Sequence, residues 1–210
     1  MARRLVVAAA VDACEEPVVR RAAALLQTAL RACGDDGVAV VPQFVADVAA
    51  VAALAPAPDY AVASLLPELA SATPVAAVEQ RWREALAAWP ASLPPALVCT
   101  IFRHVDPALA MVEREALRER IRRLALVAIE ISHDTGAHVV DFDRTLAHVG
   151  ARALASDCRF GSDAAIEVGA RTLVRSMLAL ARDESITAEM ATCVEAHLGQ
   201  PWDALAPPRP

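Results

Sequence analysis

The chain has 210 residues, 56% of them hydrophobic, and a formal net charge of −6 at pH 7. This length is sufficient for one domain whose core needs neither disulfides nor a metal. The acidic charge argues against a nucleic-acid partner, because phosphate binding requires a basic face, and no charge-free apolar run is long enough for us to expect a membrane partner.

The cysteines are odd in number and scattered without CxxC spacing, which favours a reducing, cytoplasmic compartment over a disulfide framework or a zinc site. They are Cys14, Cys33, Cys99, Cys158 and Cys193. All 20 basic residues are arginine, which indicates a GC-rich genome more than a mechanism. Arg3 and Arg4 precede an apolar run as in a signal peptide, but Asp12 interrupts that run early, so we expect no cleaved or lipidated start.

The first predicted element is a strand at residues 5–11, with the sequence LVVAAAV. Its unbroken apolar character is typical of a strand buried on both faces of a parallel sheet. Asp12 follows at the carboxyl end of this strand, where ligands and catalytic groups collect in open α/β sheets. Further strands are expected at residues 38–41, 60–66, 96–102 and 138–142, the first of these ended by Pro42.

Helices are expected where apolar residues recur at helical spacing. The predicted ranges are residues 18–33, 44–54, 74–89, 112–132, 164–182 and 186–198. Pro17 suits the first helical position, Ser185 is the expected cap of the last helix, and residues 143–163 are expected to be irregular.

Strands and helices thus alternate five times, without an internal repeat or linker. This order predicts a three-layer α/β/α sandwich around a five-stranded parallel sheet, with a flavodoxin-like topology. We expect a single domain at residues 1–199, followed by a proline-rich and loosely attached tail at residues 200–210.

In order and length, residues 4–182 resemble the SGNH (GDSL-type) hydrolases, a family of esterases and acylhydrolases on a flavodoxin-like sheet. In that family the first strand ends in Gly-Asp-Ser, whose serine is the nucleophile; here the tripeptide is Val11-Asp12-Ala13. The third strand of the family ends in Gly-x-Asn-Asp, whose asparagine serves the oxyanion hole. The matching segment here places Pro67 at the asparagine, and proline offers no donor.

The last family block is Asp-x-x-His, which supplies the orienting carboxylate and the general base. Asp157-Cys158-Arg159-Phe160 matches its position, with Phe160 in place of the base. Residues 163–166 would also fit and also lack a histidine, and Gly169 resembles the glycine of the helix that follows. The resemblance therefore implies a hydrolase fold that has lost its nucleophile, oxyanion donor and base.

Other side chains are candidates for a rearranged site. Cys14 lies one position past the lost serine and just before a helix N-terminus, which lowers a thiol pKa, although a small thiol packed under the helix is the alternative. His104, after the fourth expected strand, is a candidate base, although a lone histidine there is more often a loop residue bonded to backbone. His148, in the irregular region near Asp157, is the other candidate, for a site in which the loop has moved. We assign no catalytic residue; the candidates for the cleft are Asp12, Cys14, His104, His148 and Asp157.

Three functions remain open from the sequence. The favoured one is a non-catalytic SGNH-like protein that binds a small ligand or a protein partner through the former cleft. The second is an active esterase, acylhydrolase or acyltransferase with a rearranged site. The third is a homo-oligomeric assembly subunit whose contact is the helix that carries Trp82 and Trp89. No glycine-rich phosphate loop is present, and we expect no cofactor and no metal.

Overall fold

The computed structural model describes residues 3–180 and 185–205, which contain a five-stranded parallel sheet with the strand order β2-β1-β3-β4-β5. The strands are β1 (Arg3–Ala10), β2 (Val38–Phe44), β3 (Tyr60–Ser64), β4 (Ala96–Cys99) and β5 (His138–Val140). This is the flavodoxin-like order, in which the direction of strand progression reverses next to β1. The predicted fold class is confirmed.

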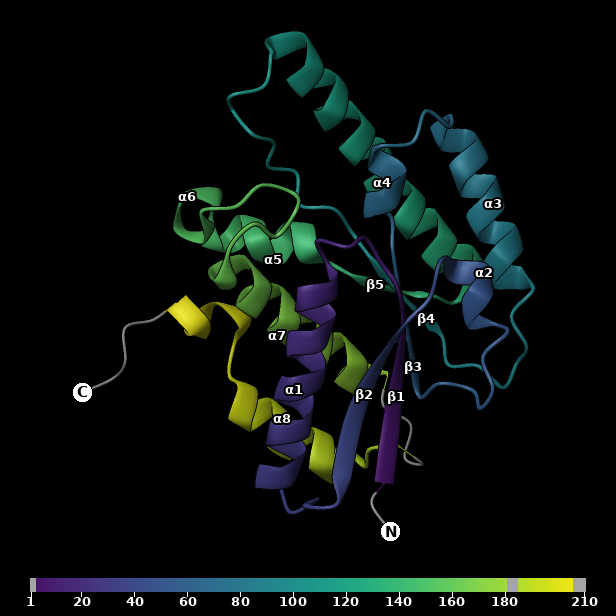
Figure 1. Ribbon diagram of the computed structural model, residues 1–210, viewed down its shortest axis with the longest axis vertical. Coiled ribbons are helices and arrows are strands. Elements are labelled where there is room, and N and C mark those ends of the chain that lie inside the picture. The colour runs from purple at the N-terminus through teal and green to yellow at the C-terminus, as the bar shows by residue number, and fades with distance from the viewer. Residues whose placement is uncertain (1–2, 181–184, 206–210) are drawn as a thin grey trace.

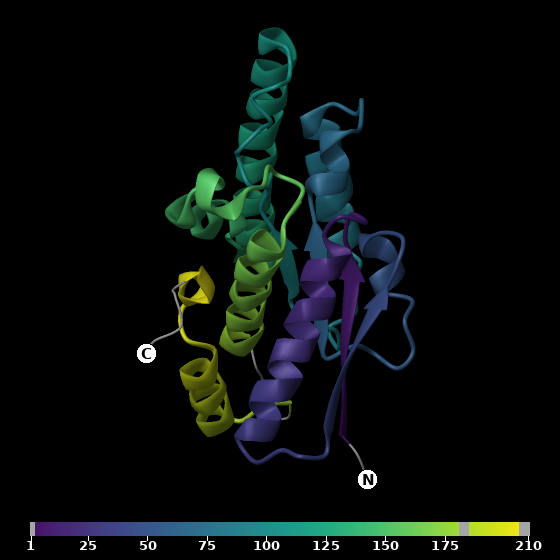
Figure 2. The ribbon, with the colours of Figure 1, turned by 60° about the vertical axis from the view of Figure 1, so that its left-hand side comes forward.

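The helices form a layer on each face of the sheet (Figure 1). One layer contains α1 (Glu16–Ala32), α5 (Phe142–Val149), α6 (Ala151–Leu154), α7 (Asp163–Ala179) and α8 (Ala188–Leu198). The other contains α2 (Val48–Val51), α3 (Val75–Ala87) and α4 (Met111–Thr135), together with the 3-10 turn η1 (Leu66–Leu69). Figure 2 shows that the first half of α4 extends beyond the edge of the sheet at which the strands end.

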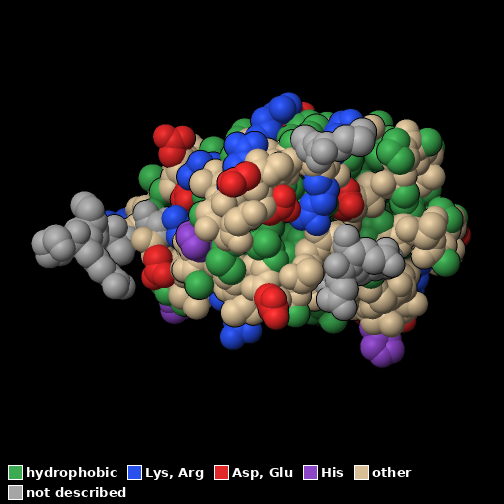
Figure 3. All heavy atoms as spheres, turned by 90° about the horizontal axis from the view of Figure 1, so that it is seen from below, with side chains coloured by type: hydrophobic (Ala, Val, Ile, Leu, Met, Phe, Trp, Pro, Cys, Tyr) green, Lys and Arg blue, Asp and Glu red, His purple; other side chains and the backbone are tan. Residues whose placement is uncertain are grey.

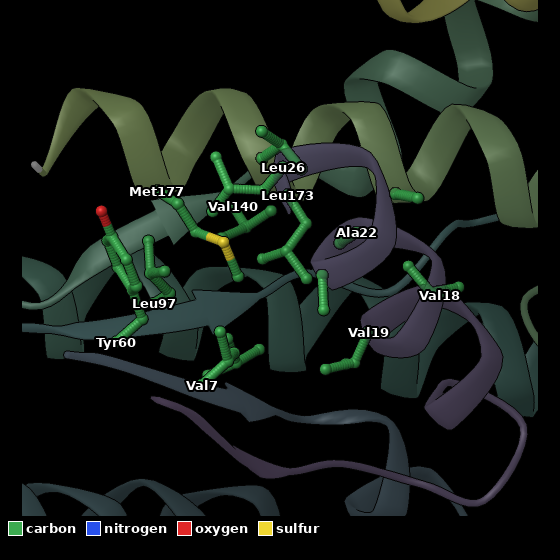
Figure 4. Close-up of a cluster of buried hydrophobic side chains, with 14 of the residues drawn as sticks. Val7, Val18, Val19, Ala22, Leu26, Tyr60, Leu97, Val140, Leu173 and Met177 are labelled. Carbon is green, nitrogen blue, oxygen red and sulfur yellow. The ribbon is translucent and has the colours of Figure 1, made fainter. Parts of the chain in front are cut away.

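Alternating residues of β1 pack against the two helical layers, which explains why its sequence is apolar without a break. Val7 and Ala9 pack with α1 and α7, whereas Ala8 and Ala10 pack with α2 on the opposite face. Figure 4 shows the first of these cores, where Leu26 of α1 and other side chains meet the sheet. Small residues on β1 let both helical layers approach the sheet closely, and this fixes the end of β1 near the centre of the molecule.

Several boundaries differ from the prediction. Pro42 does not end β2, because β2 is an edge strand in which a missing N–H costs no ladder hydrogen bond. Residues 143–163 are not wholly irregular: Asp141 caps α5 by accepting a hydrogen bond from the Arg144 N–H, and α6 follows. The predicted helix at residues 44–54 shortens to α2, and Thr187 rather than Ser185 caps α8.

One side-chain prediction is wrong. Cys33 and Cys193 form a disulfide although 160 residues separate them, because α8 lies beside the end of α1. No local spacing in the sequence reports such a contact. Trp82, expected either in the core or at a subunit contact, is 5% exposed and donates a hydrogen bond from its indole to Glu68, so it belongs to the core.

The predicted tail is partly packed onto the domain. Its residues Pro201–Leu205 form a 3-10 turn, η2, that lies against α7, with Pro201 buried. Residues 206–210 lie outside the described part of the chain. The loose attachment predicted for residues 200–210 is therefore wrong for η2.

On the end of the molecule where the strands begin, arginine and carboxylate side chains are interspersed (Figure 3). Within residues 3–180 and 185–205, no helix has the combination of length and apolar character needed to cross a membrane.

Candidate functional site

A groove of about 430 Å³ lies at the carboxyl edge of the sheet, beside the end of β1. Its walls come from the β1–α1 loop, from η1 after β3, and from the projecting half of α4 (Figure 1). The apolar wall residues are Leu66, Leu69, Ala70, Leu109, Ala116 and Leu117. The polar ones are Asp12, Cys14, Asp106, Glu113, Arg120 and Arg159.

Asp12 organises the loop between β1 and α1. Its Oδ1 accepts a hydrogen bond of 3.0 Å from the Cys14 N–H, and its carbonyl accepts from the N–H groups of Glu15 and Glu16 at 2.9 and 3.2 Å. A carboxylate bonded to the backbone two residues on stabilises a turn of this kind. Asp12 therefore both lines the groove and shapes its floor.

Beneath this loop lies a buried carboxyl group that the sequence did not indicate. Glu15 is 3% exposed; its Oε1 accepts from the Ser64 hydroxyl at 2.7 Å, and its Oε2 accepts from the Asp12 N–H at 3.0 Å. The Ser64 oxygen in turn accepts from the Leu66 N–H at 3.0 Å. One chain of hydrogen bonds thus joins the β1–α1 loop, the end of β3 and the start of η1.

Burial raises the pKa of Glu15 from its ordinary value of 4.5 to about 7, although the hydrogen bonds from Ser64 and the Asp12 N–H partly oppose the rise. In the sequence, Glu15 and Glu16 only suggest favourable charges at a helix N-terminus. The one available signal was Ser64, a single polar residue within an otherwise apolar strand.

The cysteines near the groove are held as thiols. Burial raises the pKa of Cys14 far above its ordinary value, and the hydrogen bond and charge of Asp12 act in the same direction. Burial also raises the pKa of Cys158 to about 11. Because the thiolate is the nucleophile, a raised pKa favours the structural interpretation of Cys14 over the catalytic one.

The structure separates the remaining candidates. His104 and Asp157 line a shallower depression next to the groove, and Asp106 borders both hollows. The Asp157 carboxylate accepts a hydrogen bond from the Arg159 N–H at 2.8 Å. His148 lies on α5 with its ring 4.6 Å from the ring of Trp202, and it lines neither hollow.

Three residues stand at the positions that match the hydrolase motifs. Two of them are exposed, and the third packs in the core. Ala13 is exposed in the β1–α1 loop, and Pro67 is exposed in η1. Phe160 has a left-handed φ of 53° and packs edge-to-face on Phe142 in the core. Gly169 of α7 lies directly beneath Phe160: a Cβ there would stand 2.7 Å from the ring. Phe160, which the sequence resemblance placed at the family's base, is thus a core aromatic residue.

Arg120 holds the η1 wall of the groove in place. Its guanidinium donates hydrogen bonds of 2.7–2.9 Å to the backbone carbonyls of Glu68 and Thr73. A planar, permanently charged donor suits this bridging role better than a lysine would.

Comparison with known proteins gives a likeness of fold. No protein-family model matches the sequence, and no curated protein matches it. The structure is similar to that of LAE5, described as an alpha/beta hydrolase enzyme from the metagenome of Lake Arreo, Spain, with a TM-score of 0.57, 17% identity, and coverage of 91% of this chain and 96% of that one. An acetyl xylan esterase, AlAXEase, gives a TM-score of 0.46 at 14% identity over 67% of this chain and 78% of that one. The chain thus shares the α/β fold of LAE5.

Proposed function

We propose that this protein is a degenerate SGNH-like protein that binds a small ligand in the groove and carries out no serine-hydrolase chemistry. One observation supports this most directly: among the described residues that line the groove, none is a serine, threonine or histidine. Acyl transfer through a serine needs the hydroxyl, its base and an oxyanion donor together. The groove lies where such a site is expected, at the carboxyl edge of the sheet, but its lining lacks the serine and the histidine.

Ser64 does not replace the missing nucleophile. Its hydroxyl donates to a carboxylate, as an activated serine would, but the residue is 2% exposed and lies behind the groove wall. Its oxygen also accepts the Leu66 N–H. A bound ester would have no path to this oxygen without opening of the β1–α1 loop.

The walls of the groove favour a ligand with an apolar body and a polar group. Leu66, Leu69, Leu109 and Leu117 offer apolar surface, while charged side chains of both signs border it. Mostly apolar hollows with a few polar groups are typical of small-molecule sites. The ligand is thus expected to bury its apolar part against η1 and α4.

The binding half of this proposal is tested with an amphipathic fluorophore, anilinonaphthalene sulfonate, titrated into the full-length protein. Leu117→Arg places a charge in the groove and is expected to weaken binding roughly tenfold or more. Leu126→Arg is the matched control, because Leu126 lies on the same helix and is 59% exposed. Equal binding by both variants and the wild type would contradict the assignment of the groove.

The chemical half is tested with nitrophenyl acyl esters. We expect hydrolysis no faster than in a Cys14→Ala, His104→Ala double variant. Hydrolysis by the wild type that this variant loses would instead support the rearranged-site hypothesis.

A further inference from the structure

Three metal-ligating side chains meet away from the groove, where α1 ends beside α8 (Figure 1). Cys33 caps the C-terminus of α1, and Cys193 and His197 lie four residues apart on α8. The two cysteines are joined as a disulfide. The Nδ1 atom of His197 lies 3.7 Å from the sulfur of Cys33 and 3.9 Å from the sulfur of Cys193.

We propose that Cys33, Cys193 and His197 form a binding site for a thiophilic divalent metal, of the zinc type, when the disulfide is reduced. Zinc takes sulfur at about 2.3 Å and imidazole nitrogen at about 2.0 Å in tetrahedral geometry, which places nitrogen and sulfur about 3.5 Å apart. Both nitrogen–sulfur distances are already close to this value. To admit the ion, the two sulfur atoms must move apart, and Nδ1 of His197 must exchange its 3.2 Å contact with the Cys193 carbonyl for the metal.

The surrounding backbone favours a cation at this place. Cys33 stands at the C-terminal end of α1, and His197 lies in the last turn of α8. The carbonyl-rich ends of two helices carry partial negative charge, which attracts a cation and opposes ionisation of uncoordinated thiols. A bound metal ion would therefore supply the positive charge that stabilises the two thiolates.

The connectivity suits a metal that links two elements. Cys193 and His197 are spaced i, i+4, so both side chains lie on one face of α8. Cys33 comes from the opposite end of the chain and completes a Cys₂His set, which leaves one position for water as in open zinc sites. Such a metal would hold α8 against α1 in a reducing environment, where the disulfide does not persist.

A trialkylphosphine and one water convert the disulfide into two thiols and the phosphine oxide, a two-electron reduction of the protein. Zn²⁺ then binds the two sulfur atoms and the neutral imidazole, and both thiol protons are released.

The test uses full-length protein that is reduced with a trialkylphosphine, freed of metal with a chelator, and titrated with Zn²⁺ against a chromophoric chelator. We expect one zinc per reduced chain and none in the oxidised protein. His197→Ala retains both cysteines and is expected to bind zinc roughly tenfold or more weakly. Cys33→Ser is expected to lose the site, and Cys14→Ser, which removes a thiol elsewhere, is expected to keep it.

Cobalt gives a second measurement on the same samples. Co²⁺ in the reduced wild type should show thiolate charge-transfer absorption and the strong visible bands of tetrahedral coordination, and both should vanish in Cys33→Ser. Circular dichroism of oxidised His197→Ala checks that the fold is intact. The proposal is overturned if reduced wild type binds no more zinc than Cys33→Ser, or if His197→Ala binds it as tightly as wild type.

Discussion

The Ser64 hydroxyl donates a 2.7 Å hydrogen bond to the buried carboxylate of Glu15 and so joins the end of β3 to the start of α1. Each partner is almost fully buried, and each makes a further hydrogen bond to backbone next to the groove. A buried charge is retained at small cost only when its acceptor sites are satisfied. This pair therefore helps to fix the floor of the groove, together with Asp12.

Removal of the serine hydroxyl should destabilise the fold. Ser64→Ala leaves Oε1 of Glu15 without its side-chain donor and leaves the Leu66 N–H without its acceptor. We expect a loss of about 1–3 kcal/mol in the free energy of unfolding at pH 8, measured by urea denaturation. Ser92→Ala, at an exposed loop position, should change this free energy little; equal losses in both variants would contradict the role given to Ser64.

Glu15 should make stability depend on pH. Because its pKa is about 7 in the folded protein and ordinarily 4.5, the folded state binds the proton more tightly. The contribution of Glu15 is therefore fully present below about pH 4.5 and is lost as the pH rises through about 7, by as much as about 3 kcal/mol. Glu15→Gln should flatten this part of the stability profile, whereas Glu16→Gln should leave it as in the wild type. An identical slope for the wild type and Glu15→Gln would show that Glu15 does not titrate in this window.

Gly169 should be required for the packing of Phe160. In Gly169→Ala the new Cβ would stand 2.7 Å from the Phe160 ring and 3.2 Å from Val18. Overpacking of this kind costs about 1–3 kcal/mol, which thermal and urea unfolding would register. Gly161→Ala is the control, because a Cβ at Gly161 meets nothing within 4 Å. Tolerance of alanine at residue 169 would argue against the close contact.

Cys14 should react slowly with alkylating reagents. Its pKa is raised mainly by burial, so very little thiolate is present near pH 8. Peptide mapping after a timed exposure to iodoacetamide should find Cys14 alkylated much more slowly than glutathione in the same tube. Alkylation at the rate of glutathione would reopen the catalytic interpretation of this cysteine.

The fold was largely predictable because its signals are local. The apolar run at β1, the helical spacing in α1 and α4, and the left-handed Gly136 at the end of α4 all agree with the final architecture. The strand end predicted at Pro42 was wrong because a proline is tolerated in an edge strand. Which strand lies at the edge is a property of the whole sheet and not of the local sequence.

The site was less predictable because its contacts join distant segments. Asp12 was identified from its place after β1, and the structure puts it in the groove with Cys14. The Glu15–Ser64 bond spans 49 residues and the Cys33–Cys193 bond spans 160, so no periodicity in the sequence reports either one. His148 was a candidate base on its sequence position alone, which cannot place a side chain, and in the structure its ring lies against Trp202.

If the groove binds a ligand without acyl-transfer chemistry, the protein should carry no serine that is activated for covalent attack. The most direct measurement is the intact mass of the full-length protein after incubation with a fluorophosphonate probe, which adds covalently to activated serines. We predict an unchanged mass, both for the wild type and for Ala13→Ser, because a hydroxyl restored at residue 13 still lacks a base. A stoichiometric adduct on the wild type that maps to Ser64 or any other serine would contradict the account.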